Sequence, residues 1–94
     1  MKNFTLKYMP FPEIIRGQVF AFTSEVEGKY IILIDSTRTP AVQKKNLKHE
    51  LAHIILNHYE QPERGLQELE AEADETAEKM TDADLKMLLG MASA

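Results

Sequence analysis

The segment Lys48–His53 reads K-H-E-L-A-H and contains an H-E-x-x-H pattern, whose residue types suit metal chemistry. Side chains in an α-helix are about 100° apart, so His49 and His53 would project from one face, one turn apart. Two imidazoles at that spacing can bind one metal ion. Glu50 would lie at the flank of the pair, where its carboxylate can act as a general base on a water at the metal. The pattern predicts His49 and His53 as metal ligands and Glu50 as the catalytic base.

A site of this kind needs a further ligand, because catalytic zinc usually has three protein ligands and one open position. The metzincin pattern would place a glycine three residues and a histidine six residues after His53. Those positions hold Leu56 and Tyr59, so that subclass is excluded. The chain has no cysteine, which excludes a thiolate ligand. The third ligand is therefore expected to be a carboxylate from the next helix.

The helix expected over residues 66–80 carries several acids, and its periodicity ranks them. With the apolar stripe taken as the buried direction, Glu70 lies about 70° from it, Glu72 about 90°, and Glu75 nearly opposite. Asp74, one turn after Glu70, can accept the second ring N–H of a ligand histidine. We therefore expect Glu70 as the third ligand, with Glu72 as the alternative. The stripe consists of Leu66, Leu69, Ala73, Ala77 and Met80.

The elements before the motif are predicted to be strands. Residues 19–22 and 30–34 are rich in β-branched and aromatic residues, are separated by a polar stretch, and predict a β-hairpin. Residues 4–8 alternate and can supply a third strand. Because residues 30–34 are apolar on both faces, they indicate a strand covered on both sides, or an edge strand. A free edge around Ile31–Ile34 could bind an extended substrate as an added strand.

The remaining elements are predicted to be helical. Thr39 is a suitable N-cap and Pro40 a suitable first residue for the motif helix, which should end near His58. His58 would then lie at the helix C-terminus, where a histidine interacts favourably with the dipole. Thr81 and Asp84 resemble a capping box before a last short helix. We expect an α+β fold in which a small antiparallel sheet packs on the H-E-x-x-H helix and a second ligand-bearing helix, in a zincin-like arrangement.

Composition limits the class of protein. The 94 residues are 44% hydrophobic and 28% charged, which suits one small globular domain spanning residues 1–94. A net charge of −4 without a dense basic cluster argues against direct nucleic-acid binding. No segment approaches the roughly 20 apolar residues of a membrane span, and no signal peptide is evident. A cytoplasmic location is therefore expected.

Residues 49–77, which read HELAHIILNH and then ELEAEADETA after a short loop, resemble the ImmA/IrrE family of metallopeptidases. The family pattern is H-E-x-x-H followed by E-x-x-A-N/D-x-F-A on the next helix. The resemblance implies His49, His53 and Glu70 as ligands of Zn²⁺ and Glu50 as the base. The order of the H-E-x-x-H helix and the later glutamate is also similar to the gluzincin arrangement. The chain departs from the family at Thr76, where the pattern has Phe, in its short loop, and in lacking the usual L-L-M-P stretch.

Family members are implied to cut transcriptional repressors of phages or mobile elements within a helix-turn-helix protein. The resemblance thus predicts a zinc-dependent metalloendopeptidase with a protein or peptide substrate. The alternative is a metal-stabilised, non-catalytic interaction module that retains the zinc site. Three residues could donate a hydrogen bond to the oxyanion, and their spacing does not select among them: Tyr30, His58 and Tyr59.

Overall fold

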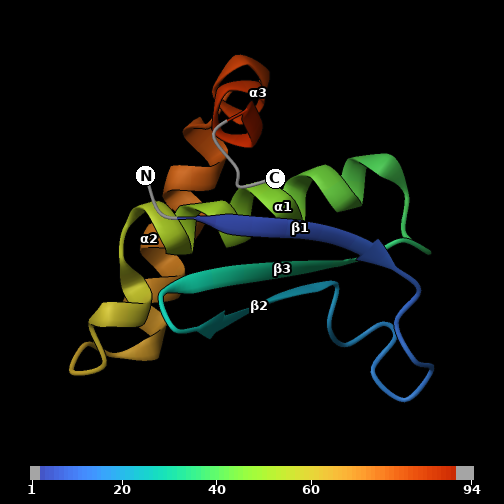
Figure 1. Cartoon of the computed structure of the whole chain (residues 1–94), viewed down its shortest axis with the longest axis horizontal. Helices are drawn as coiled ribbons and strands as arrows, with labels where there is room; N and C mark the ends of the chain where they lie inside the picture. Colours follow the sequence, from blue (N-terminus) through green and yellow to red (C-terminus); the bar gives the residue numbers. More distant parts are fainter. Residues whose placement is uncertain (1–2, 91–94) are drawn as a thin grey trace.

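The computed structural model describes residues 3–90, and within them the chain forms a three-stranded sheet and three α-helices (Figure 1). The α+β fold class is confirmed. The elements are β1 (Phe4–Met9), β2 (Ala21–Val26), β3 (Lys29–Asp35), α1 (Pro40–Ile55), the 3₁₀ turn η1 (His58–Glu60), α2 (Leu66–Lys79) and α3 (Asp82–Gly90).

The sheet has the strand order β1-β3-β2 and is mixed. β2 and β3 form the predicted antiparallel hairpin, but β2 covers residues 21–26 where a strand over 19–22 was expected. The turn is closed by Glu27 and Gly28, whose φ angles of 51° and 79° suit a two-residue turn. β1 is the third strand, but it runs parallel to β3, with Phe4 opposite Tyr30. Parallel neighbours need a crossover connection. Residues 10–20 and β2 supply it, and this is why the sheet is mixed where an antiparallel one was expected.

β3 is therefore the central strand, hydrogen-bonded to β1 on one side and to β2 on the other. The prediction of a free substrate-binding edge around Ile31–Ile34 is wrong. The other interpretation of residues 30–34, a strand covered on both sides, agrees with the structure, since a central strand contributes apolar side chains to both faces of the sheet. The edges of this sheet are β1 and β2.

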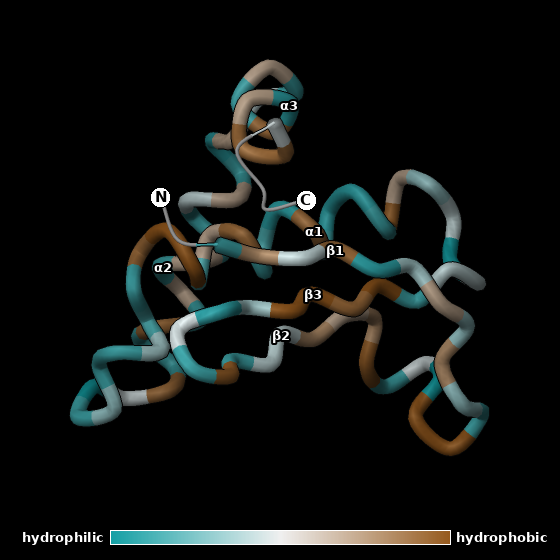
Figure 2. Tube along the Cα trace, in the orientation of Figure 1, coloured by the Kyte–Doolittle hydropathy of each residue, from teal (hydrophilic) through white to brown (hydrophobic). Residues whose placement is uncertain are grey.

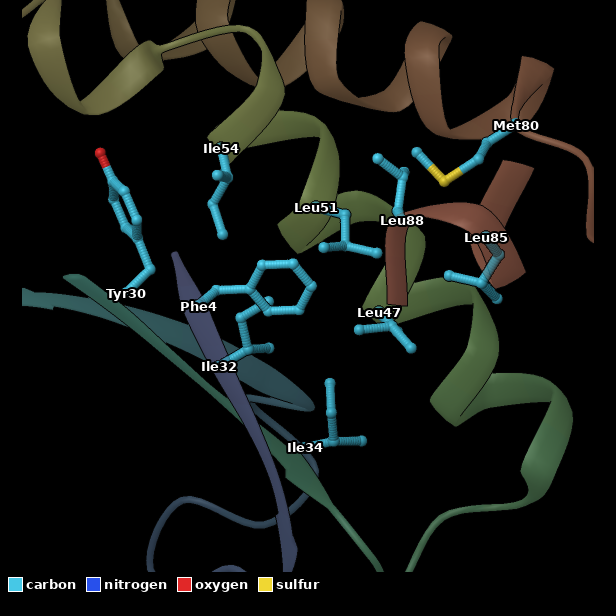
Figure 3. Packing of buried hydrophobic residues seen from close by; sticks show 10 residues of the cluster. All are labelled: Phe4, Tyr30, Ile32, Ile34, Leu47, Leu51, Ile54, Met80, Leu85 and Leu88. Carbon is cyan, nitrogen blue, oxygen red and sulfur yellow. The ribbon is translucent and has the colours of Figure 1, made fainter. Parts of the chain in front are cut away.

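The helices cover one face of the sheet. Figure 3 shows side chains of β1 and β3 packed against α1, with α3 closing the end of this core. On the opposite face Ile31 and Leu33 are half-buried, and the loop after β1 folds back so that the Phe11 ring lies 5.7 Å from that of Phe22. Figure 2 shows the hydrophobic stretch of β3 in brown. The main core cluster consists of Phe4, Tyr30, Ile32, Ile34, Leu47, Leu51, Ile54, Met80, Leu85 and Leu88.

Helix α1 begins as predicted and ends earlier. The Thr39 hydroxyl accepts a hydrogen bond from the Val42 N–H (3.3 Å), and Pro40 is the first helical residue. At the other end Asn57 adopts the left-handed conformation, with φ 57°, which stops a helix. Helix α1 therefore ends at Ile55, before the predicted His58, and the chain turns back on itself.

The last two helices follow the expected pattern with one exception. The backbone N–H of Thr81 donates to the Asp84 carboxylate (2.9 Å) and the Asp84 N–H to the Thr81 hydroxyl (3.0 Å), which confirms the capping box. Ala73 on α2 and Met80 just after it are buried, but Leu66, the first residue of α2, is 73% exposed. Among the described helices, none has the length and apolar character needed to cross a membrane.

Candidate metal centre

Helix α1 brings the two motif histidines together at its C-terminal half. The Nε2 atoms of His49 and His53 lie 3.0 Å apart, as expected for residues one helical turn apart on the same face. His53 is buried, whereas His49 is partly exposed at the side facing α2. Both rings therefore direct one nitrogen to a common point between α1 and α2.

Helix α2 adds a carboxylate at that point. The two oxygens of Glu70 lie 2.9 Å from His49 Nε2 and 3.2 Å from His53 Nε2. Ligands about 2.1 Å from a tetrahedral ion are separated by about 3.4 Å. The three side chains are therefore spaced nearly as the ligands of one metal ion are, and a set of two imidazoles and one carboxylate suits zinc. Glu70 lies where a third ligand would have to be, and its role as a ligand stays a prediction.

The second ring nitrogen of His49 also has a partner. Asp74 Oδ1 lies 2.8 Å from His49 Nδ1, the contact predicted from its place one turn after Glu70. A carboxylate in that position holds the ring with its proton on Nδ1 and leaves Nε2 free. Burial is the main cause that lowers the pKa of His53, which favours the neutral imidazole that metals bind.

Glu50 lies beside the histidines and is held by the sheet. Its carboxylate is buried and accepts a hydrogen bond of 2.8 Å from the hydroxyl of Thr23 in β2. Glu50 also offers an oxygen within 4.8 Å of the donor atoms of both histidines. Glu70 is closer to both nitrogens and remains half-exposed, whereas Glu50 is already bonded to Thr23. This arrangement suits a base next to a metal better than a ligand.

Burial raises the pKa of Glu50, although the hydrogen bond from Thr23 works in the opposite direction. The folded metal-free protein therefore binds a proton at this position more tightly than the unfolded chain does. The resulting stability is fully present below the pKa of an unfolded glutamate, about 4.3, and is lost as the pH rises through the higher folded value. At neutral pH the buried carboxylate destabilises the metal-free fold.

We expect the Glu50→Gln variant, in the presence of a chelator, to melt at a higher temperature than the wild type at pH 7, because glutamine does not ionise. The difference should disappear below about pH 4. Thermal unfolding followed by circular dichroism at several pH values measures it, with the exposed Glu13→Gln as the matched control. A lower melting temperature for Glu50→Gln at pH 7 would contradict the expected cost of burying this carboxylate.

The prediction that His58 lies at the C-terminus of the motif helix is wrong, because the left-handed turn at Asn57 ends the helix before it. His58 is buried, and its Nδ1 lies 2.9 Å from Nδ1 of His53. Its Nε2 lies 2.9 Å from Glu72 Oε1, so Glu72 contacts His58 and not the two motif histidines. Helical periodicity could not predict this contact, because His58 is no longer on the helix. An asparagine just before it was the available signal, since Asn favours the left-handed conformation.

The three candidates for oxyanion binding lie in different places. Tyr30 is in the core, and both ring nitrogens of His58 are directed to other side chains. Tyr59 is half-exposed, and its ring lies 6.1 Å from that of His53 and 5.4 Å from that of Tyr30. Burial raises the pKa of Tyr59 to about 12, against a hydrogen bond with Thr23, so its hydroxyl remains protonated. Of the three candidates for oxyanion binding, Tyr59 is thus the one that lies next to Thr23, the residue that contacts Glu50.

Comparison with known protein families gives a match over most of the chain. A family model, Peptidase_M78, described as the IrrE N-terminal-like domain, matches residues 5–87. No curated protein and no solved structure matches the chain. The matched range includes β1 apart from its first residue, all of β2 and β3, the two helices that carry the site, and most of α3.

Proposed function

The chain belongs to the Peptidase_M78 family of IrrE N-terminal-like domains, and from this premise we propose that it is a zinc-dependent endopeptidase acting on a protein substrate. One observation supports this proposal above all. His49, His53 and Glu70 converge within 3.2 Å of one another, and Glu50 is held beside them without being needed as a ligand. A structural zinc site usually has four protein ligands and no open position, whereas here three side chains converge and Glu50 is bonded to Thr23 instead.

His49, His53 and Glu70 would hold the zinc ion. The donor set fits zinc because both imidazoles are bonded through Nδ1 to other groups, which leaves both Nε2 atoms available as ligands. When bound, zinc acidifies water and polarises a carbonyl group. His53 is buried and His49 is partly covered, so the ligand positions are restrained before the ion arrives.

Glu50 would act as the general base and then as the general acid. It takes a proton from the attacking water and delivers it to the nitrogen of the leaving amine. The hydrogen bond from Thr23 orients the carboxylate, and the second oxygen remains free to receive the proton. Tyr59 would donate a hydrogen bond to the oxyanion that forms on the substrate carbonyl.

Strand β2 would bind the substrate. It is an edge of the sheet, paired with β3 on one side within the described residues, and its Thr23 contacts the catalytic base. An extended peptide can add to such an edge through backbone hydrogen bonds. A peptide bond in that added strand would then lie next to Glu50. This proposal replaces the edge at Ile31–Ile34, which β1 and β2 cover.

Helix-turn-helix repressors are the first substrates to test, because the resemblance to the ImmA/IrrE family implies them. The zinc-loaded protein should be incubated with a peptide library derived from a whole proteome and with purified repressors of this class. Mass spectrometry should detect new amino termini that appear with zinc and are absent after chelation. Stoichiometric zinc without new termini in either sample would contradict the peptidase proposal and favour the non-catalytic interaction module.

A further inference from the structure

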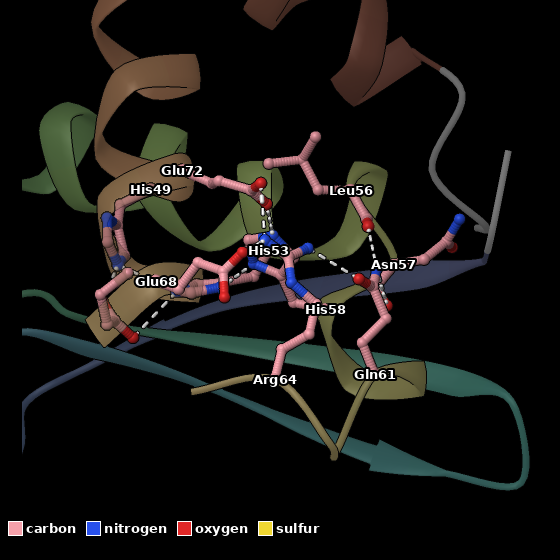
Figure 4. Close-up of polar contacts among 10 residues, drawn as sticks. His49, His53, Leu56, Asn57, His58, Gln61, Arg64, Glu68 and Glu72 are labelled. Atoms are coloured by element: carbon pink, nitrogen blue, oxygen red, sulfur yellow. Dashed lines mark hydrogen bonds and ion pairs between the residues drawn. The ribbon is translucent and has the colours of Figure 1, made fainter. Parts of the chain in front are cut away.

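Behind the proposed metal site lies a row of three side chains that we call the His58 relay, formed by His58, Glu72 and Arg64. His58 Nδ1 lies 2.9 Å from Nδ1 of His53, and His58 Nε2 lies 2.9 Å from Oε1 of Glu72. The other oxygen of Glu72 accepts a hydrogen bond of 2.7 Å from the Arg64 guanidinium. Figure 4 shows these residues with the contacts as dashed lines.

The hydrogen-bond requirements of the relay determine where each proton lies. Glu72 is paired with the Arg64 guanidinium at 2.7 Å, so at neutral pH this carboxylate is ionised and only accepts hydrogen bonds. His58 must therefore donate through Nε2. A neutral imidazole has one donor and one acceptor, so Nδ1 of His58 is left as an acceptor. Its partner, Nδ1 of His53, must then carry a proton and donate it. In the metal-free protein Glu70 Oε1 makes the opposite demand at Nε2 of His53, but that contact is longer (3.2 Å) and the carboxylate is half-exposed, so we expect the buried relay to decide the tautomer.

We propose that the His58 relay is a positioning device that keeps His53 in the tautomer with its proton on Nδ1, so that Nε2 is available to bind metal. The turn that follows α1 places His58 in the relay. The left-handed Asn57 directs His58 back toward His53, and Gln61 secures the turn by donating to the carbonyls of Leu56 (2.9 Å) and Asn57 (3.1 Å).

The two ligand histidines are thus oriented by different means. His49 contacts the exposed carboxylate of Asp74 directly, whereas His53 is buried and reaches the carboxylate of Glu72 only through a second imidazole. A carboxylate accepts from any donor, so Asp74 fixes the tautomer of His49 in one step. An imidazole can either donate or accept, so His58 fixes His53 only while Glu72 fixes His58.

The inference rests on the proposed metal site, but its main test uses metal-free protein. Nitrogen-15 NMR of the histidine rings, recorded at about pH 8 where an ordinary histidine is neutral, distinguishes the two tautomers. We expect His53 of the wild type to carry its proton on Nδ1. In Glu72→Gln the amide can donate or accept, so His58 is free to reverse and His53 should become a mixture. The matched control is Glu68→Gln, which also removes a partner of Arg64 (2.7 Å) but leaves His58 untouched.

Zinc affinity gives a second readout. Groups that orient a ligand typically contribute roughly 10- to 100-fold to metal affinity, and we expect losses of that size in Glu72→Gln and His58→Phe. His58→Gln keeps an acceptor for His53 and a donor for Glu72, so it should recover much of the affinity. Because Glu72 was the alternative third ligand, His58→Phe is decisive: it leaves Glu72 in place, so unchanged affinity would overturn the positioning role.

The positioning role and the proposed function fail separately. His53 protonated on Nε2 in the wild type, or a tautomer unaffected by Glu72→Gln, would overturn the role of the relay. A wild-type protein with the expected tautomer that does not bind zinc would instead overturn the proposed function. Circular dichroism of each variant shows that a lost contact, and not an unfolded chain, causes the change.

Discussion

Replacing Glu50 with glutamine is expected to slow peptide hydrolysis by roughly 100- to 10,000-fold, the usual contribution of a positioned general base. Glutamine has nearly the same shape and can still accept the hydrogen bond from Thr23, but it does not take a proton from water. Since Glu50 is not among the three proposed ligands, zinc binding should be retained. The measurement is the initial rate of cleavage of a substrate found in the peptide library, with zinc content determined on the same sample.

The design separates a chemical defect from a structural one. Glu50→Gln should be at least as stable as the wild type when metal-free, because burial of the carboxylate destabilises the fold at neutral pH. Loss of activity in a variant of equal or higher melting temperature cannot be attributed to unfolding. The exposed Glu13→Gln should cleave at the wild-type rate. Equal rates for Glu50→Gln and the wild type would eliminate Glu50 as the base.

Loss of activity in Glu50→Gln would also explain why the fold keeps the buried Glu50 carboxylate, which is unfavourable for stability. A buried carboxylate with one hydrogen-bond donor from the protein costs stability, and this cost is typical of active sites, where groups are held ready for reaction. Leu51 and Ala52, the next residues of α1, are fully buried and show that the same turn of the helix also supports the core. Helix α1 therefore combines a well-packed apolar stripe with the Glu50 carboxylate, whose burial is only partly compensated by its hydrogen bond.

The parts of the site that could be predicted are those that depend on one helix at a time. The convergence of His49 and His53 follows from a four-residue spacing, and the paired contacts of Glu70 and Asp74 follow from the same spacing on α2. These arguments need only helical geometry and a buried direction for each helix. The α+β class and the hairpin were likewise predictable from local alternation of residues.

The rest depends on long-range pairing or on single dihedral angles. Thr23 reaches Glu50 only because β2 is an edge strand paired with β3 in the register that puts Thr23 opposite Ile32, facing α1. The parallel pairing of β1 likewise depends on the path of residues 10–20. The contact between His58 and His53 depends on one residue in the left-handed conformation. Patterns of apolar residues carry little information about any of these.

The second prediction with a large effect concerns the third ligand. If Glu70 binds zinc, then Glu70→Gln should lose most of the stabilisation that zinc gives to the fold. At a zinc concentration of 100 times the dissociation constant, a ligand that binds only the folded state stabilises it by about 2.7 kcal/mol. In a domain of this size that corresponds to a rise in melting temperature of roughly 10–20 °C. The same zinc concentration should raise the melting temperature of Glu70→Gln by only a few degrees.

The comparison with neighbouring acids on α2 makes this test specific. Glu75 is exposed and paired with Lys79 (2.9 Å), so Glu75→Gln should keep the full zinc-induced shift. The zinc-induced shift of Glu72→Gln should lie between those of Glu70→Gln and Glu75→Gln, because this substitution weakens the orientation of His53 without removing a ligand. If Glu72 were the ligand instead, Glu72→Gln would lose the shift and Glu70→Gln would keep it. Each variant is compared with its own metal-free melting temperature, so effects of the substitution on the fold itself cancel, and the order of the three shifts identifies the carboxylate that zinc binds.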